Sequence, residues 1–355
     1  ETSRHVTGDS DLSVMAVFTA LSCVAAEQIG ARAWAQLRAS AAVLWPALVL
    51  WLALQYDFEP HPFAHGGYIA WPLAIAALYW ILWRRDADAA SLPVRILHAV
   101  AFWLVTALAT FELHWVVREL IGGGRDWPRL ALLLVPGAML AFASAGGRWP
   151  FAPQRATYVT LASLPVVVLA LAAVLWLSID SRGEAAPLPY LPLVNPLDLA
   201  TAFLALALAR WLLAYRGLAD GLWAEMRTAV LVLLGIVAFV WMNAILFRSL
   251  HHYAGIDYRL PAMLHSVLAQ SAMSLFWSAL ALVLVTFAVR VRHRVLWFTG
   301  AGLLAVVVAK LFLVDLAGTG TMARIVSFIG VGVLLLIIGY LSPVPPRAGA
   351  QEERA

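Results

Sequence analysis

The stretch TYVTLASLPVVVLALAAVLWLSI, residues 157–179, contains no charged residue. A helix needs about 20 predominantly apolar residues to cross the hydrocarbon core of a membrane. Because a segment in lipid must satisfy its own backbone hydrogen bonds, this run predicts a transmembrane helix. It is too long for the alternating strands of about ten residues that build an outer-membrane barrel.

Applied to the whole chain, the same criterion predicts an all-α, polytopic transmembrane helix bundle with about eleven spans. The expected spans are residues 12–28, 41–57, 67–83, 95–117, 130–145, 157–179, 197–215, 228–247, 268–290, 295–314 and 322–341. The first is the weakest, because Glu27 and Arg32 crowd its end. Four prolines lie inside spans and predict kinks: Pro46, Pro72, Pro136 and Pro165.

Composition supports the membrane class. Hydrophobic residues make up 63% of the chain and charged residues 12%, whereas soluble domains are about half apolar and about a quarter charged. The formal charge of +4 comes largely from arginines in short gaps between apolar runs, so a nucleic-acid partner is not expected. The single cysteine, Cys23, excludes an internal disulfide and a cysteine-rich metal site.

The arginines also predict orientation, because cytoplasmic loops carry the excess of basic residues. One set of alternate gaps holds fifteen: Arg32, Arg38, Arg84, Arg85, Arg95, Arg148, Arg155, Arg210, Arg216, Arg227, Arg290, Arg292, Arg294, Arg347 and Arg354. The other holds seven: Arg4, Arg118, Arg125, Arg129, Arg182, Arg248 and Arg259. A cytoplasmic C-terminus follows. Several tryptophans at span ends, including Trp83 and Trp211, suggest an interfacial belt.

This topology gathers polar residues on the outer side, above an apolar inner half. They are His61, His65, Glu112, His114, Asn195, Asp198, Asn243, Arg248, His251, His252, Asp315 and the GTGT loop. A carboxylate within a span normally faces a cavity or a partner, so Glu112 is either functional or paired with Arg118 or His114. Asp198 follows Asn195-Pro196, where an N-cap or first-turn acid belongs.

No metal or cofactor site is expected. His61, His65 and His265 suit solvated loops, and the adjacent His251 and His252 diverge by about 100 degrees on a helix, so they do not form a facing metal pair. The glycine motifs at 300–302, 318–320 and 330–332 lack the preceding strand and the following acid of a dinucleotide site. Small residues in membrane helices more often permit close packing.

The stretch AKLFLVDLAGTGTMARIVSFIG, residues 309–330, carries the only lysine of the chain. Lys310 and Asp315 differ by about 140 degrees around a helix, so a direct pair requires the helix to end near Val314. Otherwise Lys310 snorkels at the outer end of its span. Arg324, in the first turn after GTGT, is expected to pair with Asp315 and to brace a helical hairpin.

Residues 292–346, with the elements KLFLVDL, GTMARIVSF and GVGVLLLIIGYLSP, resemble the C-terminal part of a bacterial family of predicted multi-pass membrane proteins, domain of unknown function 2339. HPFAHGGYIAWPLA (61–74), NPLDLA (195–200) and HSVLAQSAMSLFW (265–277) support the resemblance, whereas residues 1–50 carry almost no signature. The motif residues are Asn195, Asp198, Lys310, Asp315, Gly318, Thr319, Gly320, Arg324 and Ser327. The resemblance implies a larger parent protein with more helices upstream, and it supplies no activity.

The opening residues ETSRHVTGDSDL lack an initiator Met and a signal peptide, so the chain is expected to be the C-terminal fragment of that larger protein. Residues 1–355 are interpreted as a single transmembrane region, with spans within 12–341 and a cytoplasmic tail over 342–355. The expected location is the bacterial inner membrane.

Three functions remain open. The first is binding or transport of an amphiphilic envelope component, such as a lipid-linked sugar, in an outward-facing polar cavity. Its candidate binding residues are Lys310, Asp315, Arg324, His114, Asn195, His251 and His252. The second is a membrane transferase acting on a lipid-linked substrate, with an acid as general base. Its candidate catalytic residues are Glu112, Asp198, Asp315, Asp57 and Glu59. The third is a noncatalytic scaffold.

Overall fold

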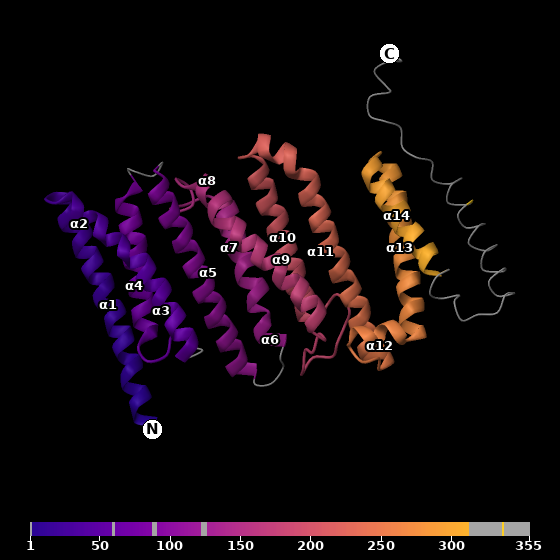
Figure 1. Ribbon diagram of the computed structural model, residues 1–355, viewed down its shortest axis with the longest axis horizontal. Helices are drawn as coiled ribbons and strands as arrows, with labels where there is room; N and C mark the ends of the chain where they lie inside the picture. The colour runs from indigo at the N-terminus through magenta and orange to yellow at the C-terminus, as the bar shows by residue number, and fades with distance from the viewer. Residues whose placement is uncertain (1, 59–60, 87–90, 122–125, 312–335, 337–355) are drawn as a thin grey trace, which may run out of the picture. The chain divides into compact units, whose positions relative to one another are not determined.

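The computed structural model describes residues 2–58, 61–86, 91–121, 126–311 and 336 (Figure 1). Within these ranges every regular element is a helix of the α, 3-10 or π type, so the expected all-α class is confirmed. The chain divides into two compact units, Glu1–Ile245 and Leu246–Ala355.

The helices of the first unit are α1 (Thr2–Arg32), α2 (Ala35–Ser40), α3 (Leu44–Phe58), α4 (Gly67–Arg84), α5 (Leu92–Ile121), α6 (Asp126–Arg129), α7 (Ala131–Ala145), α8 (Arg155–Thr157), α9 (Ser163–Asp180), α10 (Pro196–Arg216) and most of α11 (Asp220–Ala254). A 3-10 helix, Ala41–Val43, precedes α3, and a π-helix, Tyr158–Ala162, precedes α9. The second unit contains the end of α11, α12 (Leu260–His265), α13 (Val267–Arg290) and α14 (Arg294–Lys310).

Eight helical segments of the described residues are long and apolar enough to cross a membrane, and each overlaps an expected span. They are Ser13–Arg32, Gln36–Gln55, Leu92–Ile121, Asp126–Ala145, Arg155–Asp180, Pro196–Arg216, Gly221–Ala254 and Val267–Arg290. The number of about eleven is not confirmed. Helices α4 and α14 are not among the eight, and α14 has only 17 residues. The expected span 322–341 lies outside the described residues except for Leu336.

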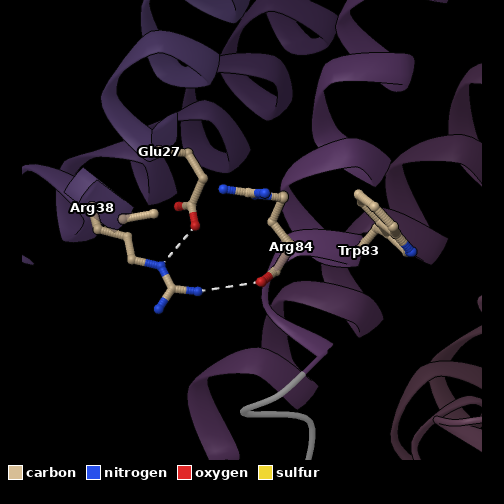
Figure 2. Close-up of a pocket in the computed structure, with 5 residues that line it drawn as sticks. Glu27, Arg38, Trp83 and Arg84 are labelled. Carbon is tan, nitrogen blue, oxygen red and sulfur yellow. Dashed lines mark hydrogen bonds and ion pairs between the residues drawn. The ribbon is translucent and has the colours of Figure 1, made fainter. Parts of the chain in front are cut away.

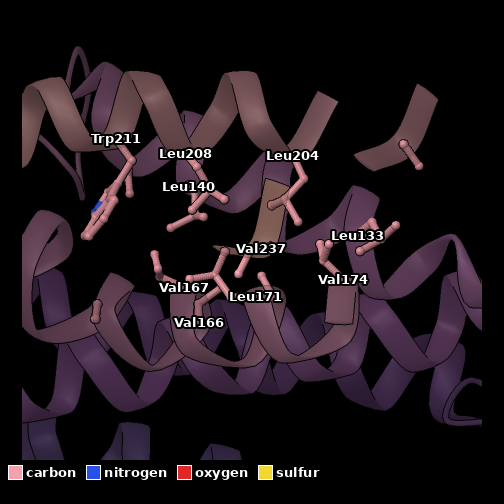
Figure 3. Packing of buried hydrophobic residues seen from close by; sticks show 14 of the residues in the cluster. Leu133, Leu140, Val166, Val167, Leu171, Val174, Leu204, Leu208, Trp211 and Val237 are labelled. Atoms are coloured by element: carbon pink, nitrogen blue, oxygen red, sulfur yellow. The ribbon is translucent and has the colours of Figure 1, made fainter. Parts of the chain in front are cut away.

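Helix α5 lies between two apolar cores of the first unit. Leu104 and Leu108 pack into one core with residues of α1, α3 and α4. Ala99 and Phe102 pack into the other core with α7, α9 and α10. Figure 3 shows leucines of α7 and α10 meeting valines and Leu171 of α9 in this second core. Since two faces of α5 are covered by protein, its sequence has no continuous polar face.

The π-helix before α9 is explained by side-chain donors that reach its carbonyl groups. The indole nitrogen of Trp211 donates to the Val159 carbonyl at 2.9 Å, and that of Trp103 donates to the Ala162 carbonyl at 2.8 Å. A backbone without water must satisfy its carbonyls in this way when the regular ladder is interrupted. Trp211 is only 5% exposed, so its ring packs inside the protein, and its expected place in an interfacial belt stays a prediction.

The four prolines occupy two kinds of position. Pro72 and Pro136 lie inside α4 and α7, as expected. Pro46 and Pro165 instead occupy the third positions of α3 and α9, directly after the 3-10 and π segments. A proline near a helix start replaces an amide that has no partner within the helix, so these two mark the restart of a regular helix.

In the second unit, α13 and α14 pack closely against each other. A Cβ added to Gly300 would lie 2.7 Å from Cγ2 of Val285 and 3.0 Å from the Ala281 carbonyl oxygen. A Cβ on Gly302 would meet no atom of the described residues within 4 Å. The close-packing interpretation of the small residues at 300–302 therefore holds for Gly300 and not for Gly302.

Candidate functional site

A buried ion cluster joins α1, α2 and the end of α4. Glu27, near the C-terminus of α1, has a fully buried side chain. Its Oε1 accepts a hydrogen bond from Nε of Arg38 at 2.7 Å, and its Oε2 accepts bonds from Nε and Nη2 of Arg85 at 3.0 and 2.7 Å. Two guanidinium groups thus compensate the cost of burying the carboxylate.

The local sequence explains how these side chains meet. A Cβ on Gly30 would lie 2.7 Å from the Cα of Arg38, so this glycine lets α2 pack directly on α1. Arg85 follows the last residue of α4, and its Nη2 also donates to the Arg38 carbonyl at 2.6 Å. Nη2 of Arg38 donates to the Arg84 carbonyl at 3.4 Å. Carbonyls near helix C-termini, which lack partners within the helix, are satisfied by these bonds.

An open pocket of about 380 Å³ adjoins the cluster and is lined by Glu27, Ala31, Arg38, Trp83 and Arg84 (Figure 2). We call it the arginine pocket. The Arg38 side chain is 32% exposed, and Trp83 and Arg84 are exposed. With Arg85 beside it, the described residues of the site contribute three guanidinium groups and one carboxylate, a formal excess of two positive charges among those residues.

The pocket lies at the end of the first unit that carries α2 and α8 (Figure 1). The α3–α4 connection and α6 lie at the opposite end. Arg38 and Arg84 lie in the gaps between spans that carry fifteen arginines. The predicted topology therefore places this end of the unit on the cytoplasmic side. The sequence instead predicts a polar cavity that faces outward, at the opposite end of this unit.

At that opposite end, Glu112 of α5 contacts His61. Their Oε2 and Nδ1 atoms are 3.2 Å apart, and the His61 ring stacks on Trp115 with 3.6 Å between ring centroids. The sequence predicts a solvated loop position for His61, and for Glu112 either a functional role or a pair with Arg118 or His114. The contact with His61 arises because the α3–α4 connection lies against α5, which residue spacing did not indicate.

The other predicted residue of α5, His114, contacts the backbone. Its Nδ1 lies 3.0 Å from the carbonyl oxygen of Pro128 in α6. Nearby, Arg129 bridges Asp126 and Asp180 at 3.3 and 2.8 Å. These contacts tie α5, α6 and α9 together with charges of both signs.

Asn195 and Asp198 serve the start of α10. Asn195 is the N-cap: its Oδ1 accepts from the Leu197 amide at 2.9 Å, and its Nδ2 donates to the Gly183 carbonyl at 2.8 Å. Asp198 lies in the first turn, as expected, and is 1% exposed. Its Oδ1 accepts a bond from the indole of Trp241 in α11 at 3.1 Å. Glu112 and Asp198 therefore engage different partners on different helices.

In the second unit, Lys310 at the end of α14 bonds to α13. Its ammonium donates to the Gln270 carbonyl at 3.1 Å and to the Ser274 hydroxyl at 2.7 Å. Nδ1 of His251 lies 2.7 Å from the Ile256 carbonyl oxygen, and the His251 and His252 rings meet edge to face. In the part of the chain that the structure describes, no group of three or more His, Cys, Asp or Glu side chains could hold a metal ion.

Several predicted site residues cannot be placed. The structure describes the backbone of Asp57 in α3 but not its side chain. The remaining ones lie outside the described residues: Glu59, Asp315, Gly318, Thr319, Gly320, Arg324 and Ser327. The expected Asp315–Arg324 contact and the role of Asp315 as partner of Lys310 stay predictions.

A second buried polar contact joins α5 to the π-helix. His98 is fully buried, and its Nδ1 lies 3.0 Å from the hydroxyl oxygen of Tyr158, which is also buried. Phe102 and Phe151 pack around the Tyr158 ring. This contact joins α5 to the π-helix beside the second core and is not part of the arginine pocket.

Sequence reasoning did not select Glu27, although a signal was present. Glu27 is an acid at the end of an apolar run, the same feature that singled out Glu112. It was interpreted only as a weakness of the first span. From the sequence alone, its partners, Arg38 and Arg85, are only indicators of membrane orientation. They lie 11 and 58 residues from Glu27, and no local sequence pattern predicts contacts over these separations.

Comparison with known proteins gives one match. A family model described as a predicted membrane protein, domain of unknown function 2339, matches residues 5–345. The match thus includes residues 5–50, in which the sequence alone shows almost no motif of the family. No curated protein and no solved structure matches the chain.

Proposed function

The chain belongs to the family of predicted membrane proteins designated domain of unknown function 2339, and on that premise we propose that it binds an amphiphilic component of the bacterial envelope. The protein is proposed to sit in the inner membrane with about eleven spans and a cytoplasmic C-terminus, as its apolar runs and arginine distribution favour. Binding, rather than catalysis, is its proposed activity.

The observation that carries the proposal is the arginine pocket. It is open, has a formal excess of positive charge, and combines Arg38 and Arg84 with the exposed indole of Trp83. Basic pockets between membrane helices on the cytoplasmic side suit anionic headgroups. Tryptophan at a membrane interface suits the boundary between a headgroup and its hydrocarbon chains.

The transferase hypothesis has weaker support. A general base must reach the proton that it removes. Glu112 contacts His61, and buried Asp198 accepts from Trp241, so both acids already have structural partners. An outward-facing site with Lys310, Asp315 and Arg324 remains a separate proposal for the second unit.

Purification from bacterial membranes tests the proposal. The full chain would be extracted in a mild detergent, and its co-purifying amphiphiles would be identified by mass spectrometry. We expect an anionic amphiphile that is enriched over the bulk membrane and depleted in Arg84→Gln. Arg216→Gln, a change of an exposed arginine at the end of α10, is the matched control. A lipid profile equal to that of the bulk membrane in all three proteins would contradict the proposal.

A further inference from the structure

We propose that the ligand group held in the arginine pocket is a phosphate, bound between the guanidinium groups of Arg38 and Arg84. This inference rests on the proposed function and names the chemical class that the site selects. The three arginines around Glu27 occupy different positions: Arg85 is nearly buried, whereas Arg38 and Arg84 line the pocket.

Arg85 acts as the fixed counter-ion. Its side chain is only 12% exposed, and it makes two bonds to Oε2 of Glu27 and one to the Arg38 carbonyl. Both bonds to Glu27 converge on one carboxylate oxygen and are charge-assisted, which makes them stronger than bonds between neutral groups. The Glu27 carboxylate lines the pocket and is shared between Arg85 and Arg38, and the cations among the described lining residues are Arg38 and Arg84.

Glu27 also fixes the orientation of the Arg38 side chain in the pocket. Its Oε1 holds Nε of Arg38 at 2.7 Å, and the Arg84 carbonyl holds Nη2 of the same side chain at 3.4 Å. The guanidinium plane of Arg38 is thus set before a ligand arrives, which lowers the entropic cost of binding. The Arg84 guanidinium lies 5.6 Å from the Trp80 ring centroid, so an aromatic face supports the second cation.

Phosphate is favoured over carboxylate by charge and by its number of oxygens. Glu27 shows that a carboxylate can meet two guanidinium groups, but a carboxylate carries one negative charge on two oxygens. A phosphate monoester carries up to two charges and three acceptor oxygens, which suit the two cations that line the pocket. The charge excess of two matches the charge of a phosphate monoester near neutral pH. A pocket of about 380 Å³ lies within the size range of small-molecule sites and accommodates a headgroup.

A phosphate can come from a membrane lipid or from a water-soluble compound, so the test includes both. The purified full chain would bind a fluorescent phosphatidic acid in detergent. Unlabelled dioctanoyl phosphatidic acid, dioctanoylglycerol, decanoate and inorganic phosphate would then compete. The same titrations would be run on Arg84→Gln and on the control Arg216→Gln, with melting temperatures to verify folding.

We expect displacement by dioctanoyl phosphatidic acid, at least tenfold weaker displacement by dioctanoylglycerol and decanoate, and about tenfold weaker binding to Arg84→Gln. Displacement by inorganic phosphate at the concentration at which dioctanoyl phosphatidic acid displaces the probe supports the phosphate site and favours a soluble ligand. Displacement by inorganic phosphate only at a much higher concentration supports the phosphate site and favours a lipid. Equal competition by decanoate, with loss of binding in Arg84→Gln, would overturn the phosphate assignment and leave amphiphile binding intact. Unchanged affinity in Arg84→Gln would overturn the pocket assignment, because the lipid would then bind elsewhere on the protein. No binding of phosphatidic acid would overturn the phosphate assignment, and the profile of co-purifying amphiphiles would decide the proposed function separately.

Discussion

At the residue scale, the decisive feature is one buried carboxylate that organises three helices. Glu27 has no exposed surface and receives three side-chain bonds from two arginines. Breaking a buried ion pair from one side is costly because the remaining charges stay in a poorly solvating environment. The cluster therefore stabilises the contact between α1, α2 and α4, and it holds Arg38 in the pocket.

Glu27→Gln should destabilise the protein strongly. The neutral amide leaves Arg38 and Arg85 without their counter-charge, at a cost of about 3 kcal/mol. Thermal unfolding of the purified protein in detergent would measure the change. Glu119→Gln, the same substitution at an exposed position near the end of α5, should leave the melting temperature within about one degree, since it disturbs no buried charge. Equal melting temperatures for the two variants would contradict the structural role of Glu27.

At the element scale, close helix approach depends on individual glycines. Gly300 and Gly302 lie two residues apart in α14, and only Gly300 has α13 atoms within 4 Å of an added Cβ. The sequence suggests helix packing for both, because periodicity alone does not identify the face that meets a neighbour.

Gly300→Ala should separate α13 from α14 and lower stability by about 1–3 kcal/mol through overpacking. Gly302→Ala should be neutral or stabilising by up to about 1 kcal/mol, because alanine favours the helical state. Melting temperatures of the two variants and the unaltered protein provide the comparison. If Gly302→Ala were the more damaging change, the packing of α14 on α13 would have to be revised.

Helix positions could be predicted from the sequence because hydropathy and length are local properties. The runs at 157–179 and 197–215 correspond to π-helix plus α9 and to α10, and the Asn195-Pro196 start signal was also local. The π-helix was not foreseen, because it depends on Trp103 and Trp211 reaching carbonyls of another helix. For the same reason, the ion pairs of Glu27 and Glu112 required knowledge of which helices are neighbours.

At the scale of the whole molecule, the two ends of the first unit carry different charged groups and are predicted to face opposite sides of the membrane. The predicted cytoplasmic end carries the arginine pocket, whereas the predicted outer end carries mixed-sign contacts such as Arg129 with Asp126 and Asp180. This assignment depends on the positive-inside rule and can be measured directly.

Single-cysteine labelling should report opposite sides for two exposed leucines. With Cys23→Ala as background, Leu188→Cys in the α9–α10 connection should react with a membrane-impermeant maleimide in intact spheroplasts. Leu218→Cys, between α10 and α11, should react only after permeabilisation. The reverse pattern would place the arginine pocket outside the cell and would invert the predicted orientation.

The central claim is that the arginine pocket holds the phosphate of an anionic ligand. An experimental density map of the full chain in nanodiscs that contain phosphatidic acid tests it most directly. The account predicts headgroup density within hydrogen-bond distance of Arg38 and Arg84, with the adjoining chain near Trp83, and its loss in Arg84→Gln. A pocket without density, in a map that resolves lipid elsewhere on the protein, would contradict the claim.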